Sequence, residues 1–139
     1  MFPFSKLEKT STGGQMPSLT ILVVEDQGAL LQGIIRILGI KFPDANILGV
    51  KNGEIALDTV MSLEGQIDLI ITDVEMPVMD GETFLREAFW AFGKLRKCTI
   101  VTGNTHERRF FTEESLPCIQ KPFNPTVLHE AIDNLLVDS

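Results

Sequence analysis

Short apolar runs alternate along this chain with stretches in which apolar residues recur every three or four positions. The runs are continuous, without polar residues at every second position, and this predicts strands that are buried on both faces, as parallel strands are. They span Leu19–Val24, Ile47–Val50, Ile67–Thr72, Thr99–Thr102 and Cys118–Ile119.

The stretches between these runs have the spacing of amphipathic helices. The periodic apolar positions are clearest over residues 30–38 and 127–136 and weaker over 55–63 and 84–92. Residues 104–114 leave room for only a short fourth helix. Five strands alternating with five helices predict an α/β fold, in which helices cover both faces of a parallel sheet.

Polar and charged residues end four of the five runs. Ligands of such sheets bind beyond the carboxyl ends of the strands, where the strand order reverses. The predicted fold therefore brings three carboxylates, a hydroxyl and an ammonium group to one edge of the sheet. These groups belong to Glu25, Asp26, Asp73, Thr102 and Lys121.

Each of these residues also has a structural explanation of its own. Glu25 and Asp26 are suited to cap the helix that follows, because acidic side chains accept hydrogen bonds from its free N–H groups. Asp73 would then be a turn residue, Thr102 an ordinary strand end and Lys121 a solvated surface lysine. Such separate roles do not require a complementary set at one edge, so the combination favours a functional site.

Electrostatics indicates what such a site would hold. Two carboxylates ~5 Å apart repel by about 3 kcal/mol at an effective dielectric constant of about 20, so three pairs approach ~10 kcal/mol, comparable to the stability of a whole domain. The cluster therefore needs a cation, or one acid must stay protonated. Oxygen ligands without nearby His or Cys favour Mg²⁺ that retains several waters. Mg²⁺ beside a lysine favours phosphate chemistry, in which both neutralise a transferring phosphoryl group.

Length and charge restrict the remaining possibilities. The chain of 139 residues has the length of one domain. Residues 1–17 show little apolar periodicity, so we expect a mobile N-terminal tail there and a folded domain over residues 18–139. Lys and Arg number 12 against 19 Asp and Glu, a net charge of −7. This charge argues against direct binding to nucleic acid, which needs clustered cations.

The chain is expected to be soluble and cytoplasmic, without a membrane contact. Its apolar runs fall well short of the ~20 residues needed to span a bilayer, and residues 1–17 lack the apolar core of a secretory signal. The two cysteines, Cys98 and Cys118, fall in apolar stretches and are expected to be buried thiols, as in a cytosolic protein.

Four segments at the strand ends have a characteristic order and spacing. They are Ile21-Leu-Val-Val-Glu-Asp26, Ile70-Ile-Thr-Asp73-Val-Glu-Met-Pro-Val-Met-Asp-Gly81, Val101-Thr102-Gly103 and Lys121-Pro-Phe123. Together they resemble the receiver domain of two-component response regulators, over about residues 19–137. The resemblance implies a flavodoxin-like, doubly wound, five-stranded parallel sheet with strand order 2-1-3-4-5 and five helices on its two faces.

The resemblance also implies a role for each acidic residue. Asp73 corresponds to the phosphoacceptor, a carboxylate nucleophile that attacks phosphorus. Asp26 corresponds to the acid that binds Mg²⁺ directly, and Glu25 to one that acts mainly through water. Glu75 would supply a backbone carbonyl to the same ion. Asp80 belongs to the loop that positions the acceptor, and we also expect it to cap the third helix.

Two further residues correspond to the parts of the family that respond to phosphorylation. Thr102 resembles the hydroxyl that closes onto the phosphoryl oxygen, and Lys121 resembles the cation that pairs with the same group. Many receivers have an aromatic residue three positions before this lysine, where the present chain has Cys118. A thiol cannot fill the same volume, so Phe110 or Phe111 would take that space or, alternatively, be ordinary core residues.

The function implied by the resemblance is that of a signalling phosphoacceptor rather than an enzyme with its own substrate. It would accept a phosphoryl group from the phosphohistidine of a histidine kinase onto Asp73, with Mg²⁺, and then change conformation to regulate a downstream protein. It would catalyse at most its own phosphorylation and dephosphorylation, as a monomer or a weak, phosphorylation-dependent dimer.

Three alternatives stay open from the sequence. A receiver cut from a hybrid histidine kinase or a larger regulator would have the same sequence features. A phosphatase with an aspartyl nucleophile uses similar groups, but it would want an Asp where this chain has Glu75, and a cap segment for its substrate. A scaffold that keeps the fold without phosphorylation is the third, against which Asp26, Asp73, Thr102 and Lys121 all argue.

Overall fold

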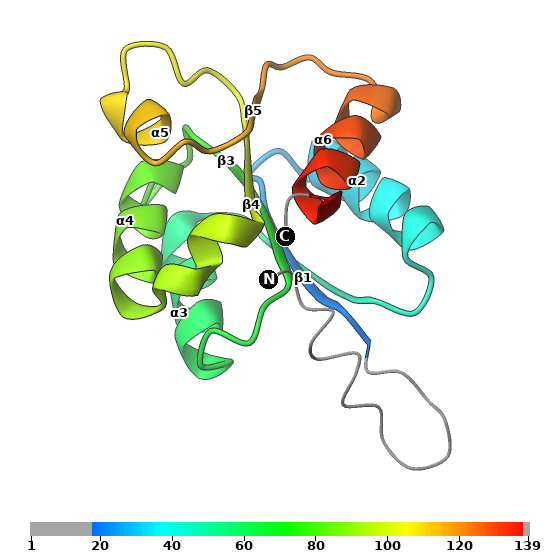
Figure 1. Ribbon diagram of the computed structural model, residues 1–139, viewed down its shortest axis with the longest axis horizontal. Coiled ribbons are helices and arrows are strands. Elements are labelled where there is room, and N and C mark those ends of the chain that lie inside the picture. The colour runs from blue at the N-terminus through cyan, green and yellow to red at the C-terminus, as the bar shows by residue number, and fades with distance from the viewer. Residues whose placement is uncertain (1–17, 138–139) are drawn as a thin grey trace.

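Five parallel strands form one sheet in the order β2-β1-β3-β4-β5 (Figure 1). The computed structural model describes residues 18–137, so the tail predicted for residues 1–17 lies outside the described residues, as do residues 138–139. The order confirms the doubly wound topology expected above. The strands are β1 (Thr20–Val24), β2 (Asn46–Val50), β3 (Leu69–Asp73), β4 (Thr99–Thr102) and β5 (Cys118–Ile119).

Helices cover both faces of the sheet, as Figure 1 shows with the sheet seen nearly edge-on. One face packs against α2 and α6, and the opposite face packs against α3, α4, η1 and α5. Each helix turns a buried apolar stripe to the sheet, such as Leu31, Ile34 and Leu38 of α2. The bounds are α2 (Gly28–Lys41), α3 (Gly53–Ser62), α4 (Gly81–Ala91), the 3₁₀ helix η1 (Gly93–Cys98), α5 (Arg109–Glu113) and α6 (Pro125–Val137).

The expectation that all five strands are buried on both faces is wrong for β2. Residues of β1, β3 and β4 are almost all buried, whereas those of β2 are half-buried or exposed. The reason is topological, because β2 pairs only with β1 and therefore forms an edge of the sheet. An apolar run does not reveal whether its strand is central or at an edge.

Short polar side chains set the starts of three helices. Asn52 accepts a hydrogen bond from the amide of Ile55 at the start of α3 (2.9 Å), and Asp80 accepts one from the amide of Thr83 at the start of α4 (2.9 Å). Asn124 does the same before α6. These bonds satisfy N–H groups that have no partner inside the helix. The cap expected at Asp80 is therefore confirmed, and it anchors the loop that follows Asp73.

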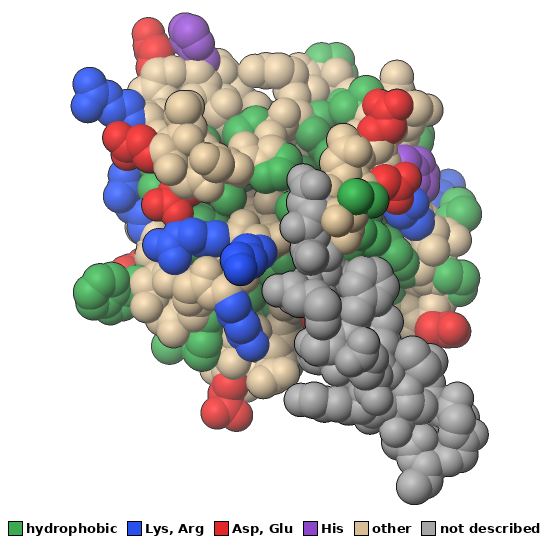
Figure 2. Space-filling model, in the orientation of Figure 1, with side chains coloured by type: hydrophobic (Ala, Val, Ile, Leu, Met, Phe, Trp, Pro, Cys, Tyr) green, Lys and Arg blue, Asp and Glu red, His purple; other side chains and the backbone are tan. Residues whose placement is uncertain are grey.

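Charged side chains of both signs lie on the surface in the view of Figure 2. In this view, Lys and Arg side chains gather over η1, whose sequence supplies Lys94, Arg96 and Lys97. Among the described residues, the helices are too short or too polar for any of them to traverse a bilayer.

Candidate functional site

Three carboxylates meet at the carboxyl ends of β1 and β3. Glu25 and Asp26 follow β1 directly, and Asp73 is the last residue of β3. One oxygen from each of the three lies within 4.8 Å of the others. Glu25 is fully buried and Asp73 is 5% exposed. Adjacent parallel strands therefore bring together acids that are about fifty residues apart in the chain, because their carboxyl ends lie at the same edge.

Lys121 supplies a positive charge to this cluster. Its ammonium nitrogen lies 2.8 Å from Glu25 Oε1 and 3.0 Å from Asp73 Oδ2. Burial by itself lowers the pKa of Lys121, but hydrogen bonds and attraction to these two carboxylates raise its pKa above the ordinary value overall. The lysine therefore stays protonated, and the explanation of Lys121 as a solvated surface residue is wrong.

Glu25 is perturbed by its burial in the site. Removal from water raises the pKa of Glu25 above its ordinary value, and the nearby charge of Asp73 adds to this effect. Hydrogen bonds from Lys121 and from the amide of Gln27 oppose the rise in pKa without cancelling it. The residue at the N-cap position of α2 is Gln27, which makes no side-chain cap bond. Capping of α2 therefore does not account for Glu25 and Asp26.

Backbone contacts hold Asp73 on two sides. Its Oδ1 accepts a hydrogen bond from the amide of Val74 at 2.7 Å. A Cβ atom added to Gly103 would lie 2.9 Å from the same oxygen, and one added to Gly81 would lie 2.0 Å from the Asp73 carbonyl. Gly103 also has φ +109°, a region that side chains other than glycine rarely adopt. Both glycines are required for the chain to pass this close to Asp73.

Thr102 lies beside Asp73 in the sheet, as its register partner on β4. The threonine is buried, and its hydroxyl donates to the backbone carbonyl of Thr72 at 3.4 Å. This long bond is a weak one, so little energy holds the hydroxyl in its present position. Glu75 lies two residues after Asp73 in the β3–α4 loop, and its side chain forms an ion pair with Arg108.

An open pocket of about 340 Å³ lies over these groups. Its lining includes four residues that the sequence predicted, Asp26, Asp73, Glu75 and Lys121. It also includes residues that sequence reasoning missed, namely Gln27, Asn104 and Gln120. Each of the three is adjacent or near to a strand-end residue already identified, so extending each motif by one or two positions would have found them.

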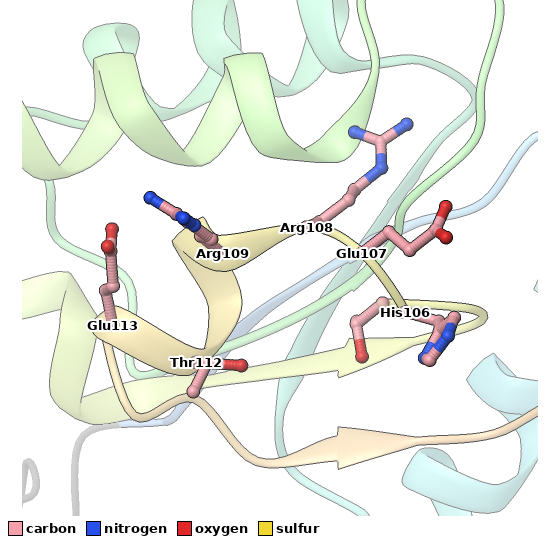
Figure 3. A pocket seen from close by; sticks show the side chains of 7 residues that line it. His106, Glu107, Arg108, Arg109, Thr112 and Glu113 are labelled. Carbon is pink, nitrogen blue, oxygen red and sulfur yellow. The ribbon is translucent and has the colours of Figure 1, made fainter.

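A second, larger hollow of about 610 Å³ lies along the β4–α5 loop and α5 (Figure 3). Its lining is polar and includes His106, Arg108 and Arg109. Phe110 and Phe111 of α5 point the other way, into the core, where both are buried and their ring centroids lie 5.3 Å apart. They are core residues, as one of the two alternatives stated.

The expectation of two buried thiols is wrong for one cysteine. Cys98 is buried, whereas Cys118 is exposed. Cys118 lies on β5, a strand of only two residues that pairs only with β4 and forms the other edge of the sheet. Its place at an edge exposes the thiol, which the apolar residues around it in the sequence did not indicate.

The arrangement is suited to bind a divalent cation and a phosphoryl group together. The described residues supply oxygen ligands within 4.8 Å of one another, which matches the preference of Mg²⁺ for carboxylates. The lysine is in contact with Asp73, a carboxylate that lines the pocket, and it can neutralise phosphoryl oxygens as charge develops. The pocket opens to solvent, and Asp73 is one of the residues that line it.

Comparisons with known proteins agree with this geometry. The family model described as "Response regulator receiver domain" matches residues 21–133. The chain is 39% identical over 122 residues to the sensor kinase CckA of Brucella abortus, covering 86% of this chain and 13% of that protein. It is 30% identical over 117 residues to the transcriptional regulatory protein FlgR of Helicobacter pylori, covering 82% of this chain and 29% of that protein.

Solved structures give the same result. The receiver domain of the hybrid histidine kinase CckA superimposes with a TM-score of 0.68 at 29% identity, covering 84% of this chain and 98% of that domain. A receiver domain from Clostridium thermocellum superimposes with a TM-score of 0.74 at 25% identity, covering 86% and 95%. The chain thus spans nearly all of these isolated domains but under a third of the curated relatives named above.

Proposed function

This chain belongs to the response regulator receiver domain family, and we propose that it is a phosphoacceptor which takes a phosphoryl group onto Asp73. The observation that carries the proposal is the contact of Lys121 with both Glu25 and Asp73, at 2.8 and 3.0 Å, beside Asp26. A carboxylate cluster paired with one lysine at the ends of parallel strands is suited to phosphoryl transfer.

The proposed reaction is a nucleophilic displacement at phosphorus. An oxygen of the Asp73 carboxylate forms a bond to phosphorus, and the bond from phosphorus to the donor's nitrogen or oxygen breaks. The electron pair of the broken bond leaves with the donor, which is the phosphohistidine of a histidine kinase or a small acyl phosphate. Lys121, already 3.0 Å from Asp73 Oδ2, would pair with the transferred oxygens.

The acidic residues fit a magnesium ion. Asp26 and Asp73 would bind it directly, Glu25 would act mainly through water, and Glu75 would offer its backbone carbonyl. The fit rests on the donor chemistry, which is all oxygen, and on the spacing of the three carboxylates. When bound, Mg²⁺ supplies positive charge that neutralises the phosphoryl oxygens.

The switch that we propose involves Thr102 and Lys121. Phosphorylation replaces one carboxylate by a group with more negative charge and three strong acceptor oxygens. Thr102 would exchange its weak bond to the Thr72 carbonyl, at 3.4 Å, for a bond to the phosphoryl group. A contact made in only one state shifts the population toward that state. The change would be recognised by a downstream protein, in the cytoplasm.

The test is phosphoryl uptake from acetyl phosphate, followed by intact-protein mass. The parent domain is expected to gain one phosphoryl group in the presence of Mg²⁺ and none after chelation. Asp73→Asn removes the nucleophile and should abolish uptake, whereas Asp68→Asn, an acid at the opposite end of β3, should not. Undiminished uptake by Asp73→Asn would refute the assignment, and turnover of phosphomonoesters would favour a phosphatase instead.

A second proposal concerns the protein to which the domain is attached. The match to CckA covers 13% of that sensor kinase, and the solved CckA domain comes from a hybrid histidine kinase. We therefore propose a receiver of a hybrid kinase as the alternative to an independent regulator, with residues 18–139 as the receiver unit in both cases. The full reading frame would distinguish the two, because only a hybrid kinase encodes the receiver and a kinase core in the same chain.

A further inference from the structure

Arg108 joins the β4–α5 loop to the β3–α4 loop. Both loops border the pocket lined by Asp26, Asp73 and Lys121, which we call the acceptor pocket. Arg108 lies in the loop before α5, and its side chain extends toward α4, as Figure 3 shows. Its Nη2 donates to Glu75 Oε1 at 2.5 Å, and its Nη1 donates to Asp80 Oδ2 and Glu82 Oε1, both at 3.2 Å. One guanidinium group therefore contacts three carboxylates from a different loop and helix.

The two halves of this guanidinium have different roles. Nη1 is fixed by Asp80 and Glu82 at the start of α4, where Asp80 also caps the helix. Nη2 is directed at Glu75 alone. The side chain of Arg108 is only 24% exposed, whereas that of Glu75 is 74% exposed. The arginine, which two other carboxylates also hold, is thus the more constrained partner, and the exposed glutamate is held by it.

Backbone strain on both sides of the contact indicates that the two loops are held in place. Val78, in the loop that carries Glu75, has φ 69°, and Glu107, directly before Arg108, has φ 68°. Residues with side chains rarely adopt this region, and a β-branched residue such as valine is an outlier there. Such conformations persist only where surrounding contacts support them.

Glu75 is the one of the three carboxylates that lines the acceptor pocket, together with Asp26 and Asp73. The pocket therefore already holds several negative charges and would receive a donor whose phosphoryl group is itself anionic. An unpaired Glu75 side chain would add a further negative charge along the path to Asp73. Like charges in a focused field of this kind slow the arrival of a charged reactant.

We propose that Arg108 is a positioning residue of the acceptor site, which binds the Glu75 carboxylate and keeps it away from the incoming phosphoryl group. The inference rests on the proposed phosphoacceptor function and deepens it. Asp80 and Glu82 hold the guanidinium in place, and the guanidinium in turn holds the negatively charged carboxylate of Glu75.

The test is a double-mutant cycle on the initial rate of phosphoryl uptake from acetyl phosphate with Mg²⁺. Arg108→Ala is expected to slow uptake on the order of threefold to tenfold at low ionic strength, and less at high salt, because salt screens exposed charges. In a Glu75→Gln background, where the controlled charge is absent, the same arginine substitution should change the rate by less than about twofold. Arg109→Ala, which removes the exposed neighbouring arginine, serves as the matched control and should leave uptake at the parent rate.

Each outcome bears on the proposal. If Arg108 only tethers the loops through Asp80 and Glu82, Arg108→Ala will slow uptake equally in the parent and in Glu75→Gln, and this result would overturn the proposal. An unchanged uptake rate in Arg108→Ala would also overturn it. If Arg108→Ala does not fold, as judged by its thermal transition, Arg108→Lys retains the charge with fewer donors, and its smaller loss must also vanish with Glu75→Gln. Uptake that persists in Asp73→Asn would instead refute the acceptor assignment itself.

Discussion

Replacing Lys121 by methionine removes the positive charge between Glu25 and Asp73 while keeping a side chain of similar length. In the parent protein the Glu25 and Asp73 side chains are only 1% and 7% exposed, and both contact the lysine nitrogen. The substitution therefore leaves two buried carboxylates facing each other and Asp26, with oxygens within 4.8 Å. Removal of one partner of a buried ion pair is far more damaging than loss of a surface pair.

The size of the effect follows from this geometry. Each pair of carboxylates at 4.8 Å repels by about 3 kcal/mol at an effective dielectric constant of about 20. Measured losses on breaking a buried pair are about 3–5 kcal/mol. We expect Lys121→Met to lower the free energy of unfolding by about 3–4 kcal/mol, and the thermal midpoint by about 10 °C for a domain of this size.

The loss should depend on pH. Because the pKa of Glu25 is raised above its ordinary value of 4.5, the folded protein holds that proton more tightly than the unfolded chain does. Stability therefore falls as the pH rises from 4.5 through the raised pKa, and the full cost is present above it. Lys121 opposes this rise, so without the lysine the window extends to higher pH. The variant should regain stability on acidification, and to a greater extent than the parent.

Urea unfolding at several pH values, with and without Mg²⁺, measures these effects. Mg²⁺ should recover part of the lost stability, because it replaces the missing positive charge among the same carboxylates. Lys97→Met removes an exposed lysine of η1 and should change stability by less than about 0.5 kcal/mol. A loss in Lys121→Met that is no larger than in this control, or that is independent of pH, would refute the reasoning.

Two further variants and one labelling experiment test other parts of the structure. Gly103→Ala would put a Cβ atom 2.9 Å from Asp73 Oδ1 at φ +109°, so we expect about 1–3 kcal/mol of destabilisation by urea unfolding and slower phosphoryl uptake. Asp80→Ala removes the cap of α4 and should cost about 1 kcal/mol at neutral pH. Hydrogen bonds hold the pKa of Asp80 below its ordinary value of 3.8 despite partial burial, so this contribution should be lost as the pH falls below 3.8. Native thiol labelling should modify exposed Cys118 before buried Cys98, with a rate that climbs at alkaline pH because the thiolate is the reactive form.

Each of these three expectations has a result that would contradict it. Parent-like stability and uptake in Gly103→Ala would show that the strand end can move away from Asp73. A difference between parent and Asp80→Ala that stays constant down to pH 2 would exclude the carboxylate as the stabilising form of the cap. Equal labelling of the two thiols, or preferential labelling of Cys98, would contradict the position of β5 at the edge of the sheet.

The apolar pattern by itself determined the elements and their topology class. Continuous runs separated by helical stretches predicted five parallel strands with helices on both faces. The strand order, which the structure also confirms, came from the resemblance to receiver domains and not from the apolar pattern. The apolar pattern did predict that Glu25, Asp73 and Lys121 would meet, because the carboxyl ends of parallel strands lie at one edge whatever the details of packing. Their roles in phosphoryl transfer stay predictions.

Other features depend on tertiary contacts and could not be derived from local sequence. The apolar run of β2 and the thiol of Cys118 proved accessible because each strand lies at an edge, and edge position is a property of the whole sheet. Arg108 and Glu75 are 33 positions apart, and neither belongs to a periodic pattern. Ion pairs between loops arise from the path of the backbone, which only the folded chain defines, so the partner of Glu75 emerged from the tertiary structure alone.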